Sequence, residues 1–191
     1  MKVFIEQTCE LRKKNVFDKV TGLYIKTVDF HLTYPYAYGY ILDTLASDGD
    51  ELDCYIITKQ QFEHSTVIEC EIIGMVEYFE DGQEDHKMFM VPVGEDGAVT
   101  DEIKSRLLEF DARFFEVQPN KNTRVGDFLG KEAALKEIEK ANLKLWCHWL
   151  KRFFSGVRSL VIQQNPSLQY CLLRQWLPLS GGAYHQLRPL W

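Results

Sequence analysis

Four acidic residues stand together just before an apolar run in the segment "LASDGDELDCYIIT", residues 45–58. Asp48, Asp50 and Asp53 are spaced i, i+2 and i+5, and Glu51 lies between the last two. Carboxylates packed together repel one another unless a positive group joins them. Mg²⁺ and Mn²⁺ favour such oxygen ligands. The segment therefore predicts either a divalent metal site or a solvated acidic turn, since Asp and Gly are common turn residues.

Two known motifs that use such acids fit this segment poorly. A calcium-binding EF-hand loop beginning at Asp48 would need an oxygen ligand where Leu52 stands and a glycine where Asp53 stands. A phosphotransferase of the haloacid dehalogenase type carries its D-x-D pair after a buried strand, with the first Asp as nucleophile. Here the apolar run follows the acids. The order of residues therefore excludes the first motif and disfavours the second.

A second acidic segment, "EDGQEDHK", occupies residues 80–87 and ends on Lys87. If the two acidic segments lie on neighbouring strands of a barrel, they face one cavity. That cavity would hold enough carboxylates for several metal ions and a lysine to meet an anion. This combination is typical of phosphoryl transfer assisted by two or more metals.

The elements that must position these acids are predicted mainly as strands, because the segments are rich in β-branched and aromatic residues. In 52–58, alternation places Asp53 and Tyr55 on one face and Cys54 on the other. Several short strands joined by turns predict a small barrel or sandwich. The predicted strands are residues 2–7, 23–33, 52–58, 66–80 and 87–93, with 34–45 as extended chain.

Two helices are predicted after the strands, at residues 101–117 and 130–154. Both have apolar residues at helical spacing, and the second is acidic in its first turns and basic in its last. The fold class is therefore mainly β with C-terminal helices, an α+β arrangement. The two predicted apolar stripes are Ile103, Leu107, Phe110 and Phe114 in the first helix, and Leu135, Ile138, Leu145 and Trp149 in the second.

The composition excludes several classes of protein. A length of 191 residues suits one domain with a hydrophobic core and leaves room for an appendage. The net charge of −6 disfavours nucleic-acid binding. No apolar run of about 18 residues and no N-terminal apolar leader are present, so we expect no transmembrane span. Five cysteines without a C-x-x-C pair predict reduced thiols in a cytoplasmic protein.

The charge is unevenly distributed along the chain. All 28 acidic residues lie in residues 1–140, whereas 141–191 hold six basic residues and all four tryptophans. We therefore predict a domain over 1–143 and a basic, Trp-rich extension over 144–191 that continues the last helix. This extension is either a membrane-surface or partner-binding element, or a fused segment with little evolved function. Its apolar content predicts self-association, so we expect a homo-oligomer.

The motifs, taken in order, resemble those of the family I soluble inorganic pyrophosphatases. "DGDELD" resembles the family's D-x-D-P/E-apolar-D pattern, and "YPYAYGYI" resembles its Y-P-x-N-Y-G-[FY]-I segment. Other segments resemble its lysine-bearing hairpin, its D-x-x-x-x-D-x-K segment and the stretch before its final helix. The resemblance covers roughly residues 2–143 and is carried by residues 14–22, 34–41, 48–53, 80–87 and 124–134.

The resemblance implies a five-stranded OB-like β-barrel with packed helices, and Mg²⁺-dependent hydrolysis of pyrophosphate or a related small diphosphate; Mn²⁺ or another divalent cation is an alternative. Asp50 would also help to deprotonate the attacking water, which the metals activate. Lys14, Tyr38 and Lys87 would contact phosphate oxygens, and Glu6 would belong to an outer acidic shell. The implied metal ligands are Asp48, Asp50, Asp53, Glu80 and Asp85.

The sequence also departs from the family pattern. Val16 replaces a glutamate, Ala37 an asparagine, Glu80 an aspartate and Phe114-Phe115 a Tyr-Lys pair, and one arginine has no clear match. Arg113 stands one residue before this pair, and a shift of one residue turns a side chain around the helix axis by about 100°. One lost phosphate-binding donor costs on the order of 2–4 kcal/mol of transition-state stabilisation. We therefore expect slow hydrolysis.

Two alternatives follow from the same departures. The chain is either a catalytically weak homologue that binds metal and phosphate as an interaction or sensor module, or a phosphohydrolase with another substrate. In the second case the altered phosphate-binding residues admit a larger group.

Overall fold

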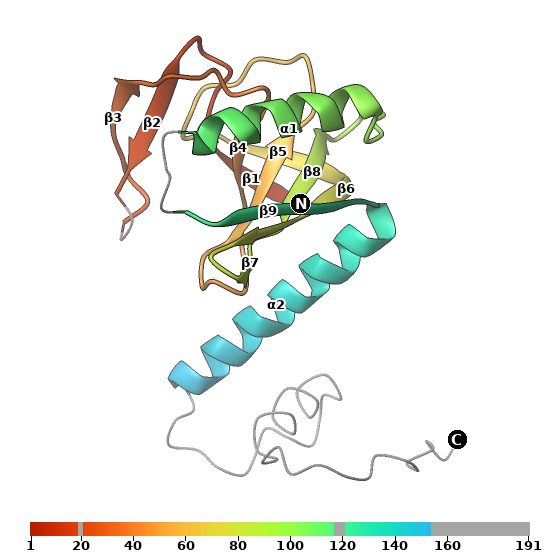
Figure 1. Cartoon of the computed structure of the whole chain (residues 1–191). Helices are drawn as coiled ribbons and strands as arrows, with labels where there is room; N and C mark the ends of the chain where they lie inside the picture. The colour runs from red at the N-terminus through yellow and green to blue at the C-terminus, as the bar shows by residue number, and fades with distance from the viewer. Residues whose placement is uncertain (19–20, 117–120, 154–191) are drawn as a thin grey trace. The chain divides into compact units, whose positions relative to one another are not determined.

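The structure, a computed structural model, describes residues 1–18, 21–116 and 121–153 (Figure 1). Neither helix in these ranges has the length and apolar character needed to cross a membrane. The elements are β1 (Lys2–Gln7), β2 (Lys13–Phe17), β3 (Tyr24–Asp29), β4 (Ala37–Ile41), β5 (Leu52–Ile56), β6 (Val67–Glu80), β7 (Gln83–Glu84), β8 (Lys87–Pro92), α1 (Asp101–Phe115), β9 (Thr123–Gly130) and α2 (Lys131–Phe153).

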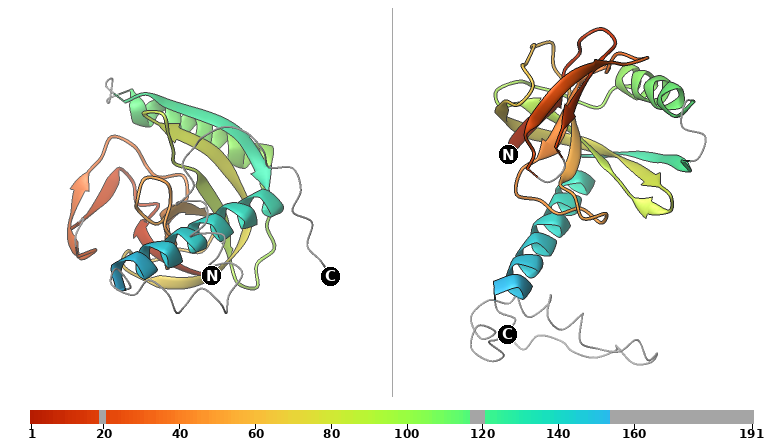
Figure 2. Two further views of the ribbon diagram at one scale, coloured as in Figure 1. Left: turned by 90° about the horizontal axis from the view of Figure 1, so that it is seen from below. Right: turned by 90° about the vertical axis from the view of Figure 1, so that its left-hand side faces the viewer.

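Five of the strands close into a ring. The order is β1-β4-β5-β8-β6, and β6 pairs back onto β1. All of these pairs are antiparallel except β5 with β8, which run parallel. Strands β7 and β9 add to β6 outside the ring, and β2 and β3 form a separate hairpin (Figure 2). The predicted five-stranded barrel and α+β class are confirmed.

Strict alternation along the strands sorts residues between the barrel interior and its outer face. In β5, Cys54 is fully buried in the barrel core, whereas Asp53 and Tyr55 line a cavity on the other side. The separation of these residues onto two faces is as predicted from the sequence, and the structure shows that the Cys54 face is the inward one. The same core contains Val3, Ile5, Ile41, Leu52, Ile56, Ile72, Met88 and Met90.

Helix α1 covers part of the outer face of the barrel (Figure 1). Thr100 caps its first turn by accepting a hydrogen bond from the Ile103 N–H. Ile103 and Leu107 pack against Tyr36 and Phe89. Phe110 and Phe114, the other two residues of the predicted stripe, pack in a neighbouring cluster with Leu32 and Tyr34. The predicted apolar face of α1 is therefore confirmed.

The predicted apolar stripe of α2 was wrong by one residue. The buried apolar side chains are Ala134, Ile138 and Ala141, whereas Leu135 is 44% exposed. Each residue turns a helix by about 100°, so Ala134 rather than Leu135 lies on the face of Ile138 and the half-buried Leu145. Alanine is a weak sequence signal, yet its small side chain lets the helix approach the barrel closely.

The chain divides into two compact units, Met1–Leu145 and Trp146–Trp191. Residues 154–191 and the side chain of Trp149 lie outside the described part of the chain. The predicted boundary between 143 and 144, and the two alternatives for the extension, therefore stay predictions.

Three strands were not predicted from the sequence: β2, β9 and the two-residue strand β7. Strand β9 carries two glycines and three charged or polar residues, so it shows no clear alternation. Its extended form is fixed by pairing with the long strand β6, from Gly74 to Glu80. Strand β2 was expected only as part of a hairpin. Strand β9 depends on a partner distant in sequence, which local propensity does not reveal, whereas β2 pairs with the adjacent strand β3.

Gly39 provides a test of the pairing between β1 and β4. A Cβ atom there would lie 1.8 Å from the carbonyl oxygen of Phe4. We expect Gly39→Ala to lower the free energy of unfolding by about 3 kcal/mol or more, because the two backbones must separate. Guanidinium unfolding measures this. Gly130→Ala is the matched control, since nothing lies within 4 Å of a Cβ at that position. Equal stability of both variants would contradict the close approach.

Candidate active site

A cavity of about 370 Å³ lies between the outer face of the barrel and α1. The alternation described above directs outward-facing residues of β1, β4, β5, β6, β8 and β9 toward it. Five carboxylates and three ammonium groups line the cavity, so it carries an excess of negative charge. These charged residues are Glu6, Lys14, Asp53, Glu80, Asp85, Lys87, Asp111 and Lys121.

Lys87 lies at the centre of the charged residues. Its Nζ is 2.5 Å from the Asp53 carboxylate and 2.7 Å from that of Asp85. Burial lowers the pKa of Lys87, but the two carboxylates outweigh it and leave this pKa above its ordinary value. Burial also raises the pKa of Asp85, against the opposing effect of Lys87. The parallel pairing of β5 with β8 brings these residues together.

Glu6 and Tyr38 are half-buried beside this triad. Burial, followed by the negative charge of Asp53, raises the pKa of Glu6 to about 7, and Lys14 only partly opposes this. Burial and Asp53 also raise the pKa of Tyr38 well above its ordinary value. Tyr38 therefore remains a neutral hydroxyl donor at physiological pH.

Lys14 is placed by a buried amide pair. The Gln7 amide donates to the Asn15 carbonyl at 2.9 Å, and the Asn15 N–H donates back to the Gln7 side chain at 2.7 Å. The Lys14 Nζ then lies 5.7 Å from the ring centroid of Phe30 and 5.6 Å from that of Phe114. Burial lowers the pKa of Lys14. Phe114, expected as core packing, thus also contacts a cavity lysine.

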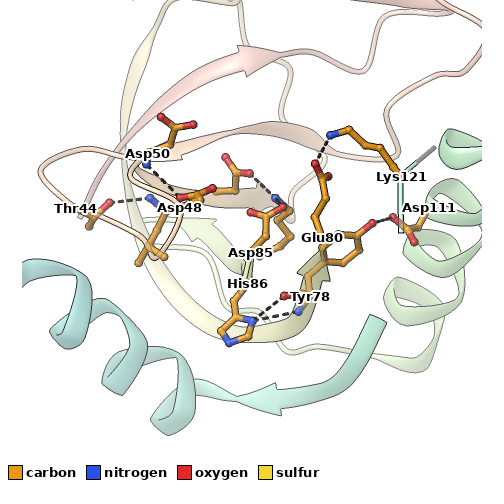
Figure 3. A network of polar contacts seen from close by, with 12 residues as sticks. Thr44, Asp48, Asp50, Tyr78, Glu80, Asp85, His86, Asp111 and Lys121 are labelled. Atoms are coloured by element: carbon orange, nitrogen blue, oxygen red, sulfur yellow. Dashed lines mark hydrogen bonds and ion pairs between the residues drawn. The ribbon is translucent and has the colours of Figure 1, made fainter. Parts of the chain in front are cut away.

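Three polar residues of the cavity were missed by the sequence analysis. Lys121 forms an ion pair with Glu80, and the Tyr78 hydroxyl donates to Asp111 at 2.9 Å (Figure 3). Burial raises the pKa of Asp111. Asp111 comes from α1, and Lys121 from the segment just before β9. No motif contains either residue, so only the folded arrangement identifies them.

Two of the predicted acids lie outside the cavity lining. Asp48 and Asp50 are exposed in the loop before β5, where the Asp50 N–H donates to the Asp48 carboxylate at 3.1 Å. Figure 3 shows Asp50 at the edge of the network. Both still act on the cavity through their charge. The cavity gathers seven of the nine predicted site residues: Glu6, Lys14, Tyr38, Asp53, Glu80, Asp85 and Lys87.

The donors of the cavity suit a hard divalent cation, because they are carboxylates without thiolate or imidazole ligands. The raised pKa values of Glu6 and Asp85 reflect buried negative charge that a cation would stabilise. Within the described residues, no group of three or more Asp, Glu, His or Cys side chains lies close enough together to hold a metal ion. Lys87 instead holds Asp53 and Asp85 by ion pairs.

Arg113 and Ala37 do not supply the missing family groups. Arg113 lines a separate cavity, where its carbonyl oxygen lies 3.4 Å from the His31 Nε2. Ala37 is buried in the barrel core. Among the described residues, the cationic side chain that lines the cavity in addition to Lys14 and Lys87 is Lys121.

Comparison with known proteins decides the family. The inorganic pyrophosphatase family model matches residues 3–145. The chain belongs to the inorganic pyrophosphatase family. The resemblance drawn from the motifs is thereby confirmed. Members of this family generally depend on a divalent cation.

Individual relatives agree with this assignment. The inorganic pyrophosphatase of Geobacillus stearothermophilus is 34% identical over 150 residues, which cover 73% of this chain and 90% of that protein. The structure of an inorganic pyrophosphatase from Coxiella burnetii has a TM-score of 0.67 at 26% identity, covering 76% of this chain and 94% of that one. The enzyme from Thermus thermophilus, at 22% identity and a TM-score of 0.67, supports the fold.

Glu6 predicts a pH dependence of stability in metal-free protein. Its ordinary pKa is 4.5 and its folded pKa about 7, so between these values the folded state binds more protons than the unfolded state. Its contribution to the free energy of unfolding therefore falls as pH rises through this window, on the order of 3 kcal/mol in total.

We expect Glu6→Gln to remove this loss, so that the variant is more stable than wild type at pH 8 in EDTA. Urea unfolding at pH 5 and pH 8 measures it. Glu10→Gln, at an exposed glutamate just beyond β1, controls for the loss of one charge. A Glu6→Gln variant with the pH slope of wild type would contradict the burial argument.

The ion pairs of Lys87 lead us to predict that a Lys87 variant depends on Mg²⁺ for its stability to unfolding. Lys87→Met leaves Asp53 and Asp85 without their ammonium group, and we expect the free energy of unfolding in EDTA to fall by about 3 kcal/mol. Mg²⁺ should restore more stability to this variant than to wild type. The control is Lys13→Met, which removes the exposed Lys13–Asp29 pair and should change little. Thermal unfolding with and without Mg²⁺ tests both.

Proposed function

We propose that the protein hydrolyses inorganic pyrophosphate, or a small diphosphate, to its two phosphate products with Mg²⁺ as cofactor. The observation that carries the proposal is the half-buried triad of Lys87 with Asp53 and Asp85 in a cavity that also contains Lys14 and Tyr38. These are phosphate-binding and cation-binding groups facing one another. Membership of the inorganic pyrophosphatase family supports this assignment.

The proposed cation ligands are Asp48, Asp50, Asp53, Glu80 and Asp85. A bound divalent cation supplies Lewis acidity toward water and neutralises charge on phosphate oxygens. Asp50 is proposed to accept the proton of the attacking water on its carboxylate. Its exposure in the loop before β5 leaves this carboxylate free to meet water. Glu6, with its raised pKa, belongs to the outer acidic shell in this proposal.

Three side chains are proposed to bind the phosphates. Lys87 is kept charged by its two carboxylate neighbours, so it meets the substrate as an ammonium group. Lys14 presents its charge from between two aromatic rings, where little water competes for it. Tyr38 contributes a neutral hydroxyl donor. As negative charge builds on the leaving phosphate, such preorganised donors lower the barrier.

Slow turnover is part of the proposal. Phe114 packs against Lys14 where family members carry a polar residue, and Arg113 lines another cavity. Lys121 brings one cation to the charged cavity, but it is paired with Glu80. The same features favour the second candidate, a weakly catalytic homologue that binds metal and phosphate in sensing or interaction.

We further propose a cytoplasmic homo-oligomer. Among the described residues, Cys9, Cys54 and Cys70 are free thiols, as expected in a reducing compartment. Leu23 and Ile25 expose 68% and 55% of their surface on and beside β3, which suits contact with a second copy.

Asp50→Asn tests the mechanism. We expect phosphate release from pyrophosphate with Mg²⁺ to fall by about a hundredfold or more, because the variant lacks the proposed proton acceptor. Asp43→Asn is the control: Asp43 is an exposed turn residue with φ 62°, a conformation that Asn also adopts. Undiminished activity of Asp50→Asn would refute the mechanism. Absence of release by wild type, with metal binding intact, would favour the sensor module.

A further inference from the structure

The cavity has an apolar half that inorganic pyrophosphate does not use. Besides the charged residues, which include Asp111 on α1, the cavity is lined by apolar side chains from α1 and β9. We call this surface the apolar wall. It consists of Leu107, Leu108, Phe110, Phe114, Val125 and Phe128.

Part of the apolar wall is open to solvent. Leu107 and Phe110 are buried by packing, whereas Leu108, beside them on α1, lines the cavity and remains 45% exposed. Phe114 is half-buried. Pyrophosphate presents only charged oxygen atoms, which gain nothing from such a surface and lose hydration beside it. An apolar group would bury this surface favourably.

The apolar wall adjoins the phosphate-binding groups. The Lys14 Nζ lies 5.6 Å from the ring centroid of Phe114, so one end of the proposed diphosphate site meets the wall. On the other side of the cavity, Lys87 stands between Asp53 and Asp85. The volume of about 370 Å³ is in the range of pockets for small organic ligands, roughly 300–1,000 Å³.

We infer that the cavity accepts a diphosphate monoester, with the diphosphate contacting Lys14 and Lys87 and an apolar or aromatic organic group lying against the apolar wall. The inference rests on the proposed function, because it uses the same phosphate-binding lysines. It adds the class of substrate: an organic diphosphate in addition to the inorganic ion. The replacement of a family Tyr-Lys pair by Phe114-Phe115 is then a change of specificity.

The corresponding reaction is a hydrolysis of the phosphoanhydride bond. The oxygen of one water bonds to the terminal phosphorus, and the bond from that phosphorus to the bridging oxygen breaks. The bridging oxygen stays on the organic monophosphate, and the water oxygen leaves in inorganic phosphate. One hydrogen of the water remains on a phosphate product, and the other passes as a proton to a product or to solvent. No oxidant or reductant is required.

Binding of two non-hydrolysable probes tests the inference. These are the 2-phenylethyl and methyl monoesters of methylenediphosphonate, which share the diphosphonate group and differ in the organic group. Calorimetric titration of the full chain with Mg²⁺ gives both dissociation constants. We expect the phenylethyl ester to bind about tenfold more tightly, since its ring buries apolar surface. Equal affinities would overturn the inference.

A matched pair of variants locates the contact. Leu108→Gln makes the exposed part of the apolar wall polar at similar size, and we expect it to reduce the tenfold preference to about twofold. Leu135→Gln is the control, because Leu135 is equally exposed, at 44%, on α2 and does not line the cavity. A preference reduced equally by both variants, or by neither, would also overturn the inference.

Phosphate release separates this inference from the proposed function. Pyrophosphate, methyl diphosphate and 2-phenylethyl diphosphate are compared as substrates. Hydrolysis of pyrophosphate with equal binding of the two probes would leave the proposed function standing and reject the apolar wall as a binding surface. A phenylethyl preference without hydrolysis of any of the three would support the wall and reject the proposed hydrolysis.

Discussion

The arrangement of the cavity depends on one interaction, the half-buried contact of Lys87 with Asp53 and Asp85. An ammonium group and two carboxylates are costly to bury separately and tolerable together. The contact joins β5 to β8, the parallel pair of an otherwise antiparallel ring. Removing Lys87 would leave the carboxylates of Asp53 and Asp85 without a positive partner. A divalent cation could neutralise the same two carboxylates. The triad therefore links the stability of the barrel to the chemistry proposed for it.

The rest of the cavity is organised around this charged centre. Lys14 reaches it from the β2–β3 hairpin, which the Gln7–Asn15 amide pair fastens to β1. Its ammonium group lies beside the rings of Phe30 and Phe114. That of Lys87 forms ion pairs with two carboxylates and also lies over the ring of Tyr78. The difference divides the cavity into a charged half and an apolar half. A ligand with both characters would use both halves.

Much of the fold follows from local patterns. Alternation in β5 separates Cys54 from Asp53, because successive side chains of a strand point to opposite faces. The stripe of α1 is correct because Ile103, Leu107 and Phe110 are large and regularly spaced. The stripe of α2 was misjudged because its contact surface is made by alanines, which weigh little in an apolar pattern. Strand β9 lacks a pattern and owes its form to β6.

By itself, the sequence determined the acids before β5, the lysine that starts β8 and the family to which the motifs belong, because these features are contiguous or follow strand periodicity. The tertiary structure alone decided which residues complete the cavity. Lys121 meets Glu80 across 41 residues, and Asp111 meets Tyr78 across 33. The tertiary structure also places Asp48 and Asp50 outside the cavity lining and Phe114 beside Lys14. Such contacts arise only when separate elements pack, so no local spacing encodes them.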